Sequence, residues 1–149
     1  MTLFTQEKAD PLLLLDRFLR HWPGGGCRLY PKEEHRELMD YAVLKKNFEN
    51  HRFHTSYFET TEEAAAYLSD QIKGEKVGFG GSITAKEMNL FEILGKNNEV
   101  IWHWEQGPDA RIKAKDSTVY ILSANAAAAT GQIINIDGTG NRLSESLFG

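Results

Sequence analysis

Apolar and polar positions alternate along most of this chain with two different periods. Short runs rich in β-branched and aromatic residues predict buried strands over residues 53–58, 76–79, 99–104, 118–122 and 133–136. Apolar residues recur at helical spacing over residues 31–50, in the segment after Thr60, and over residues 82–94. Strands that alternate with helices favour an α/β fold, with a mostly parallel sheet flanked by helices.

Local signals mark several element boundaries. Thr60 and Glu63 form a capping-box pattern, and Gly95 stands where a helix C-cap glycine belongs. The alanine run over residues 126–129 predicts either a helix start or a tightly packed turn.

The first 26 residues differ in character from the rest. Asp10 and Pro11 predict the start of a helix that runs to about His21. Pro23 and the three glycines at positions 24–26 then interrupt the chain. We therefore expect a helical N-terminal appendage over residues 1–26 and an α/β domain over residues 27–149.

Composition and charge restrict the class of protein. The chain has 149 residues, of which 41% are hydrophobic and 26% charged, as expected for one globular domain with a sizeable core. The formal net charge of −4 argues against nucleic acid or an anionic membrane as a partner. The sequence shows neither a secretory signal nor an apolar run long enough to span a bilayer, so a cytoplasmic location is expected.

Metal, redox and nucleotide sites find little support in the sequence. The single cysteine, Cys27, can neither form an internal disulfide nor hold an iron–sulfur cluster alone. The five histidines lack HxxxH and HExxH spacing, so no metal site is predicted. The glycine clusters lack the third glycine of a dinucleotide fingerprint and the lysine of a P-loop. We expect no cofactor in this chain.

The segment Gly80-Gly81-Ser82 follows a predicted strand and opens a predicted helix. In open α/β sheets, ligands bind beyond the carboxyl ends of the strands. Backbone N–H groups there, with a hydroxyl from Ser82 or Thr84, would suit a phosphate or carboxylate. A tight turn in which Ser82 only caps the helix explains the same residues equally well.

A second polar cluster lies in the loops after the fourth predicted strand. Arg142 is its strongest candidate, because a guanidinium can hold a carboxylate or phosphate with two parallel hydrogen bonds. Asn125, Asn135 and Asn141 could orient a ligand. The alternative is that Arg142 pairs with Asp137 and the asparagines satisfy the loop backbone.

Two carboxylates are candidates for catalysis. Glu87, one turn into the helix after Ser82, would be a base or nucleophile if it faces the site, or would simply favour the positive end of the helix dipole. Asp137 could bind a hydroxyl or act as a base. The candidate ligand-binding residues are Gly80, Gly81, Ser82, Thr84, Asn125, Thr130, Gly131, Asn135, Gly138, Gly140, Asn141 and Arg142.

Taken in order, these residues resemble the signature of a known family. The matching segments are Gly80-Gly81-Ser82-x-Thr84-x-x-Glu87, Asn125-Ala126, Thr130-Gly131 and Asp137-Gly138-x-Gly140-Asn141-Arg142. From about Tyr41 to Gly149, the chain is similar to the LUD domain of lactate-utilisation protein C and its relatives. The resemblance implies a fold like that of the ribose-phosphate isomerase, glucosamine-phosphate deaminase and CoA-transferase group.

The resemblance also implies a function in bacterial growth on L-lactate. Relatives act with iron–sulfur partner proteins that oxidise L-lactate to pyruvate, so we expect a subunit or accessory factor that binds a small anionic metabolite. Two other hypotheses stay open. One is a stand-alone enzyme of the sugar-phosphate isomerase or CoA-transferase type, in which Glu87 or Asp137 moves a proton or forms an acyl adduct. The other is a ligand-sensing module without catalysis.

Two features of the family pattern are missing from this chain. The family usually continues beyond Phe148 and Gly149 with another strand, so we expect the domain here to lack it. The C-terminal cysteine cluster of some relatives is also missing, so any iron–sulfur cluster would belong to a partner. The sequence neither requires nor excludes a homo-oligomer.

Overall fold

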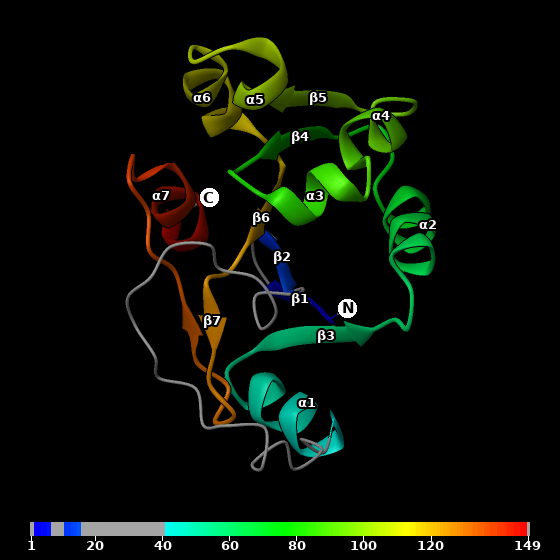
Figure 1. Cartoon of the computed structure of the whole chain (residues 1–149), viewed down its shortest axis with the longest axis vertical. Coiled ribbons are helices and arrows are strands. Elements are labelled where there is room, and N and C mark those ends of the chain that lie inside the picture. The colour runs from blue at the N-terminus through cyan, green and yellow to red at the C-terminus, as the bar shows by residue number, and fades with distance from the viewer. Residues whose placement is uncertain (1, 7–10, 16–40, 149) are drawn as a thin grey trace.

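The computed structural model describes residues 2–6, 11–15 and 41–148, which form a mixed sheet with helices on both faces (Figure 1). The strand order is β3-β1-β2-β6-β4-β5. The strands are β1 (Thr2–Gln6), β2 (Pro11–Leu15), β3 (Phe53–Tyr57), β4 (Lys76–Phe79), β5 (Glu99–Trp102) and β6 (Val119–Ser123). Strands β2, β6, β4 and β5 are parallel, and β1 runs antiparallel between β3 and β2. The predicted α/β class with a mostly parallel sheet is confirmed.

The helices follow the strands in the alternation that the sequence predicts. They are α1 (Tyr41–Asn50), α2 (Thr61–Gln71), α3 (Ile83–Glu87), α4 (Leu90–Leu94), α5 (His103–Gln106), α6 (Ala110–Lys113), a 3₁₀ turn (Ala114–Asp116) and α7 (Asn141–Phe148). A separate hairpin pairs β7 (Ala126–Ala127) with β8 (Ile133–Ile134). Within the described residues, no helix has the length and apolar character needed to cross a membrane.

Two apolar cores lie on opposite faces of the sheet because side chains alternate along each strand. On one face, Phe79 and Ile121 pack with buried residues of α2, α3 and α4. On the other, Tyr120 and Leu122 pack with Phe48 of α1 and with α6. Neighbouring residues of β6 thus belong to opposite cores, which holds helices on both faces of the sheet.

Two predicted helix boundaries are confirmed, but the break between α3 and α4 was not predicted. The Thr60 hydroxyl accepts from the Glu63 N–H and the Glu63 carboxylate accepts from the Thr60 N–H, so the capping box that begins α2 is confirmed. Gly95 is the C-cap of α4. The predicted helix over residues 82–94 is divided in two, however, because Asn89 has a left-handed backbone with φ of 54°.

Three other predictions differ from the structure in whole or in part, and one helix was not predicted. Residues 11–15 form β2 rather than the start of a helix, so that prediction is wrong there; its remaining residues lie outside the described part. Strand β5 ends at Trp102, and His103 begins a helical turn. The alanine run forms β7 and then enters the β7–β8 turn, so of the two predicted alternatives the helix start is wrong and the turn is confirmed for residues 128–129. Helix α7 was not predicted. The expected domain boundary at residue 26 lies outside the described residues and stays a prediction.

The Gln106 side chain covers the outer edge of β5, which is the last strand in the described sheet. Its amide oxygen accepts from the Trp102 N–H at 3.0 Å, and its amide nitrogen donates to the Val100 carbonyl at 3.2 Å. The backbone groups of successive residues in a strand point to alternate sides. Glu99 bonds toward β4, so the groups of Val100 and Trp102 face away from that strand. One side chain therefore satisfies groups that would otherwise be open to pairing with another strand.

Replacing Gln106 with alanine should expose this strand edge. We expect a loss of about 1 kcal/mol in the free energy of unfolding, from two lost hydrogen bonds at a partly exposed position, and increased self-association. Urea denaturation and sedimentation velocity measure both effects. Gln71→Ala is the control, since the Gln71 side chain bonds only to Asp70 among the described residues. Equal stability and sedimentation of the two variants would contradict the interpretation.

Candidate functional site at the carboxyl edge of the sheet

The carboxyl ends of β4, β5 and β6 meet on one side of the molecule. In Figure 1 the arrowheads of β4 and β5 point toward the side where α5, α6 and α7 lie. The Gly80 N–H continues the ladder by donating to the Ile121 carbonyl at 2.8 Å. The Ser82 and Ser123 hydroxyl oxygens, which follow β4 and end β6, lie 2.5 Å apart. The edge predicted to bind a ligand is therefore a connected set of residues.

Ser82 fixes the turn between β4 and α3. Its side chain is 2% exposed, and its hydroxyl accepts from the Ala85 N–H at 3.0 Å, so the predicted helix cap is confirmed. The backbone N–H groups of Gly81 and Ser82 make no hydrogen bond to any other residue that the structure describes. Capping and ligand binding are therefore compatible in this turn, since they use different atoms.

Gly80 must be glycine for its neighbours to fit. A Cβ atom at this position would lie 2.8 Å from Cγ of Arg142 and 3.2 Å from Cβ of Leu122. The Gly80 carbonyl accepts from the indole N–H of Trp102 at 2.9 Å, and this bond fixes the orientation of the peptide between Gly80 and Gly81. The missing side chain thus makes room for the stem of Arg142.

The guanidinium of Arg142 lies against two backbone carbonyls. Nη1 donates to the Ser123 oxygen at 3.3 Å, and Nη2 donates to the Ile136 oxygen at 2.6 Å. The alternative in which Arg142 forms an ion pair with Asp137 is not what the structure shows. In the described part of the chain the ion pairs are Lys45 with Glu49 and Lys73 with Asp70, and neither involves Arg142.

Asp137 organises the start of α7. One carboxylate oxygen accepts from the backbone N–H groups of Arg142, at 2.6 Å, and Leu143, at 3.3 Å; the other accepts from the Thr139 N–H at 3.2 Å. Burial raises the pKa of Asp137, but these three N–H groups and the Arg142 charge outweigh it, so the pKa lies below its ordinary value. The geometry is that of a helix-capping carboxylate; its catalytic role stays a prediction.

His103 is a site residue that the sequence analysis missed. It directly follows β5, and its Nδ1 is buried without a hydrogen-bond partner in the described part of the chain. Burial, reinforced by the charge of Arg111, lowers the pKa of His103, against opposing effects of the Phe79 backbone and Asp137. The imidazole is therefore neutral at pH 7. The sequence places His103 inside the strand predicted over residues 99–104, so its position just after the true end of β5 was not recognised.

The predicted asparagines hold the loops around Arg142. Asn125 accepts from the Ile136 N–H at 2.7 Å, and Asn141 donates to the Tyr120 hydroxyl at 3.3 Å. Burial is the main cause of the raised pKa of Tyr120, so the phenol is neutral at pH 7. Asn135 differs, since its Oδ1 is buried without a partner among the described residues.

The remaining predicted residues lie in the β7–β8 turn, in α3 and in the loop that leads to α7. Thr130 and Gly131 lie in the β7–β8 turn, where a Cβ at Gly131 would meet the Asn47 oxygen of α1 at 2.5 Å. Glu87 ends α3 and is exposed, while Thr84 is 9% exposed in its first turn. No heavy atom lies within 4 Å of where a Cβ at Gly138 or Gly140 would stand, and Gly140 has φ of +81°. The ligand roles of these residues stay predictions.

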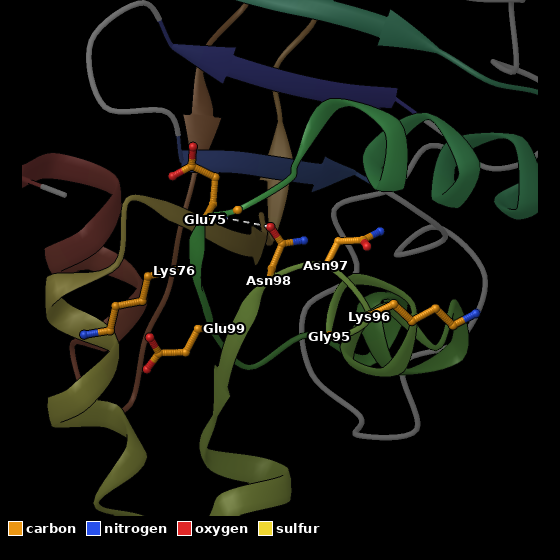
Figure 2. Close-up of a pocket in the computed structure, with 8 residues that line it drawn as sticks. Glu75, Lys76, Gly95, Lys96, Asn97, Asn98 and Glu99 are labelled. Carbon is orange, nitrogen blue, oxygen red and sulfur yellow. Dashed lines mark hydrogen bonds between the residues drawn. The ribbon is translucent and has the colours of Figure 1, made fainter.

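A shallow pocket of about 550 Å³ lies at the opposite edge of the sheet. Figure 2 shows its lining residues, which are Gly74, Glu75, Lys76, Gly95, Lys96, Asn97, Asn98 and Glu99. Asn98 is the centre of this region, and its side chain accepts from the Glu75 N–H and donates to the carbonyls of Ile72 and Leu94. These bonds join the amino ends of β4 and β5 to α2 and α4, so the pocket is built from structural contacts.

Comparison with known proteins identifies the family. A family model for the LUD domain matches residues 41–149. The chain belongs to the LUD domain family. This domain is associated with lactate utilisation. No curated protein and no solved structure gives a significant match. Within the described residues of this LUD domain, no group of three or more His, Cys, Asp or Glu residues is arranged to hold a metal ion.

Removing the Asp137 carboxylate should destabilise the domain in a pH-dependent way. Because its pKa is lowered in the folded state, the ionised carboxylate stabilises the fold above its unfolded pKa of about 4, and this contribution is lost as the pH falls through the folded value. We expect Asp137→Ala to cost about 1 kcal/mol at pH 7, with a smaller difference from wild type at low pH, measured by urea denaturation.

The matched control is Asp109→Ala. Asp109 precedes α6 as its N-cap but makes no capping hydrogen bond, so its removal should change stability by less than about 0.5 kcal/mol at either pH. A cost for Asp137→Ala that is the same at pH 7 and at low pH would contradict the assignment to its ionised form.

Proposed function

We propose that this LUD-domain protein binds a small carboxylate of the lactate or pyruvate type at the carboxyl edge of its sheet. It would support the oxidation of L-lactate to pyruvate as a subunit or accessory factor. The observation that carries the proposal is the Arg142 guanidinium, a cation that forms no ion pair with a described carboxylate, held at the strand ends where α/β sheets bind ligands.

The hydrogen-bonding capacity of the edge supports an anion. A guanidinium has five N–H donors, and the two bonds to Ser123 and Ile136 leave three for a ligand. The N–H groups of Gly81 and Ser82 add two donors without a described partner. A carboxylate accepts several hydrogen bonds and binds Arg with two of them, so donor-rich surroundings of this kind favour it over a neutral ligand.

The second polar group of lactate also has candidate partners. The Ser82 and Ser123 hydroxyls bond to each other, and Ser123 is half-buried. The neutral His103 imidazole has a nitrogen without a described partner, which could accept or donate one hydrogen bond. A 2-hydroxy acid would thus pair its charge with Arg142 and its hydroxyl with this neutral set.

Oxidation of lactate requires an electron acceptor. The reaction removes two electrons and two protons from the C–H and O–H bonds of the alcohol carbon, which becomes a ketone. Iron–sulfur clusters need several cysteines, and this sequence contains one, Cys27. We therefore propose that a partner protein carrying iron–sulfur clusters accepts the electrons, while this chain binds and orients the anion.

A thermal-shift experiment with Arg142→Ala tests the proposal. L-Lactate or pyruvate at about 100 times its dissociation constant should stabilise the wild-type protein by about 2.7 kcal/mol, which raises its melting temperature. Each variant is compared with its own ligand-free sample, so a change in basal stability does not affect the result. We expect the shift to disappear in Arg142→Ala.

Lys96→Ala is the control, because it removes one positive charge at the opposite edge of the sheet and should retain the full shift. Sugar phosphates and coenzyme A complete the panel. A shift by one of these ligands alone, lost in Arg142→Ala, would replace the lactate proposal with the isomerase or transferase hypothesis. A lactate shift that survives in Arg142→Ala would contradict the site.

A further inference from the structure

Three aromatic rings form a column that leads from the core to the candidate site. Phe79 stacks on Trp102 with ring centroids 5.0 Å apart and an angle of 25° between the planes. Trp102 stacks on Trp104 at 5.2 Å and 23°. The first two rings are 1% exposed, whereas Trp104 is 42% exposed. The column therefore ends in an indole whose surface is partly open to solvent.

The open indole lies against the glycine loop of the candidate site. A Cβ at Gly81 would be 3.4 Å from Cζ2 of Trp104, which is ordinary van der Waals contact. A Cβ at Gly80 would meet the stem of Arg142 at 2.8 Å. Because consecutive Cα atoms are about 3.8 Å apart, the loop carries the stem of Arg142 and the Trp104 indole at neighbouring positions.

The column holds the Trp104 ring in a defined orientation. Trp102 is itself held by its hydrogen bond to the Gly80 carbonyl and by its contacts with Phe79 and Phe91. A ring stacked on this support loses little freedom when a ligand binds it. An oriented, half-exposed indole beside donors for an anion is a surface that fits a flat ring attached to the anion.

We propose that Trp104 is a ring-binding subsite of the anion site, so that the preferred ligand is an anion carrying a flat aromatic ring. The inference rests on the anion site of the proposed function and extends its ligand from a small carboxylate to an anion that carries a ring. A 2-hydroxy acid with an aryl group and a nucleotide phosphate share this chemistry. In both, a negative group binds near Arg142 while the ring covers Trp104.

Titration calorimetry with two matched ligand pairs tests the inference. The first pair is L-lactate and L-3-phenyllactate, and the second is ribose 5-phosphate and AMP; in each pair only the second member has the ring. For at least one pair, we expect wild-type protein to bind the aromatic member about tenfold more tightly. The pair that shows the preference identifies the head group as a carboxylate or a phosphate.

Variants of Trp104 assign the preference to its ring. In Trp104→Ala the two members of the pair should bind within about twofold of each other, while the affinity for the ring-free member is unchanged. Trp104→Phe should retain most of the preference. Ile112→Ala removes a 70% exposed side chain from α6 and should leave both affinities as in wild type. If Trp104→Ala does not fold, Trp104→Leu replaces it with the same expected result.

The failure of this inference can be told apart from the failure of the proposed function. Binding of L-lactate without a ring preference in either pair, or a preference that survives in Trp104→Ala, would overturn the ring subsite alone. The absence of binding by all four ligands would overturn both proposals.

Discussion

The Arg142 side chain crosses Gly80 and connects the C-terminal loop to the edge of the sheet. Its stem occupies the space that any other residue at position 80 would fill, and its guanidinium donates to carbonyls from the β6 end and from Ile136. A guanidinium in a half-buried place needs hydrogen-bond partners, since an unpaired polar group is costly to remove from water. The loop conformation after β6 and the glycine after β4 therefore depend on one side chain.

The asparagines and Asp137 make that arrangement possible. Asp137 binds the backbone N–H of Arg142 rather than its guanidinium, so the acid builds the helix start and leaves the positive charge without an ion pair among the described residues. Asn125 holds the backbone of Ile136, whose carbonyl is a partner of the guanidinium. The polar residues of the family signature thus form a scaffold around one cation.

Features set by nearby residues could be predicted from the sequence, and features set by distant contacts could not. The capping box at Thr60 and strand β4 depend on local pattern and were predicted. The leucine run after Pro11 suits a helix or a strand, and its pairing with β6, far along the chain, decides between them. Within the site, Arg142 was predicted from its chemistry. His103 and Trp104 were not, because their role depends on where β5 ends.

The two edges of the sheet differ in whether they leave hydrogen-bond donors without a partner. At the amino edge, the side-chain amide of Asn98 bonds to three backbone groups, and its surroundings join strands to helices. At the carboxyl edge, three of the five side-chain donors of Arg142 and the N–H groups of Gly81 and Ser82 have no described partner. Unused donors are what an anion requires, so the carboxyl edge is the better candidate although the shallow pocket lies at the other.

The most direct test of the Arg142 anion site is an NMR titration of the ¹⁵N-labelled protein with L-lactate. The account predicts that the largest shifts occur at the Gly81 and Ser82 amides and at the Arg142 side-chain N–H. Shifts that are largest at Glu75 and Asn98 would contradict the Arg142 site. The absence of any shift at ligand concentrations in the tens of millimolar would also contradict it, since a dissociation constant above about 1 mM corresponds to a binding free energy of less than about 4 kcal/mol.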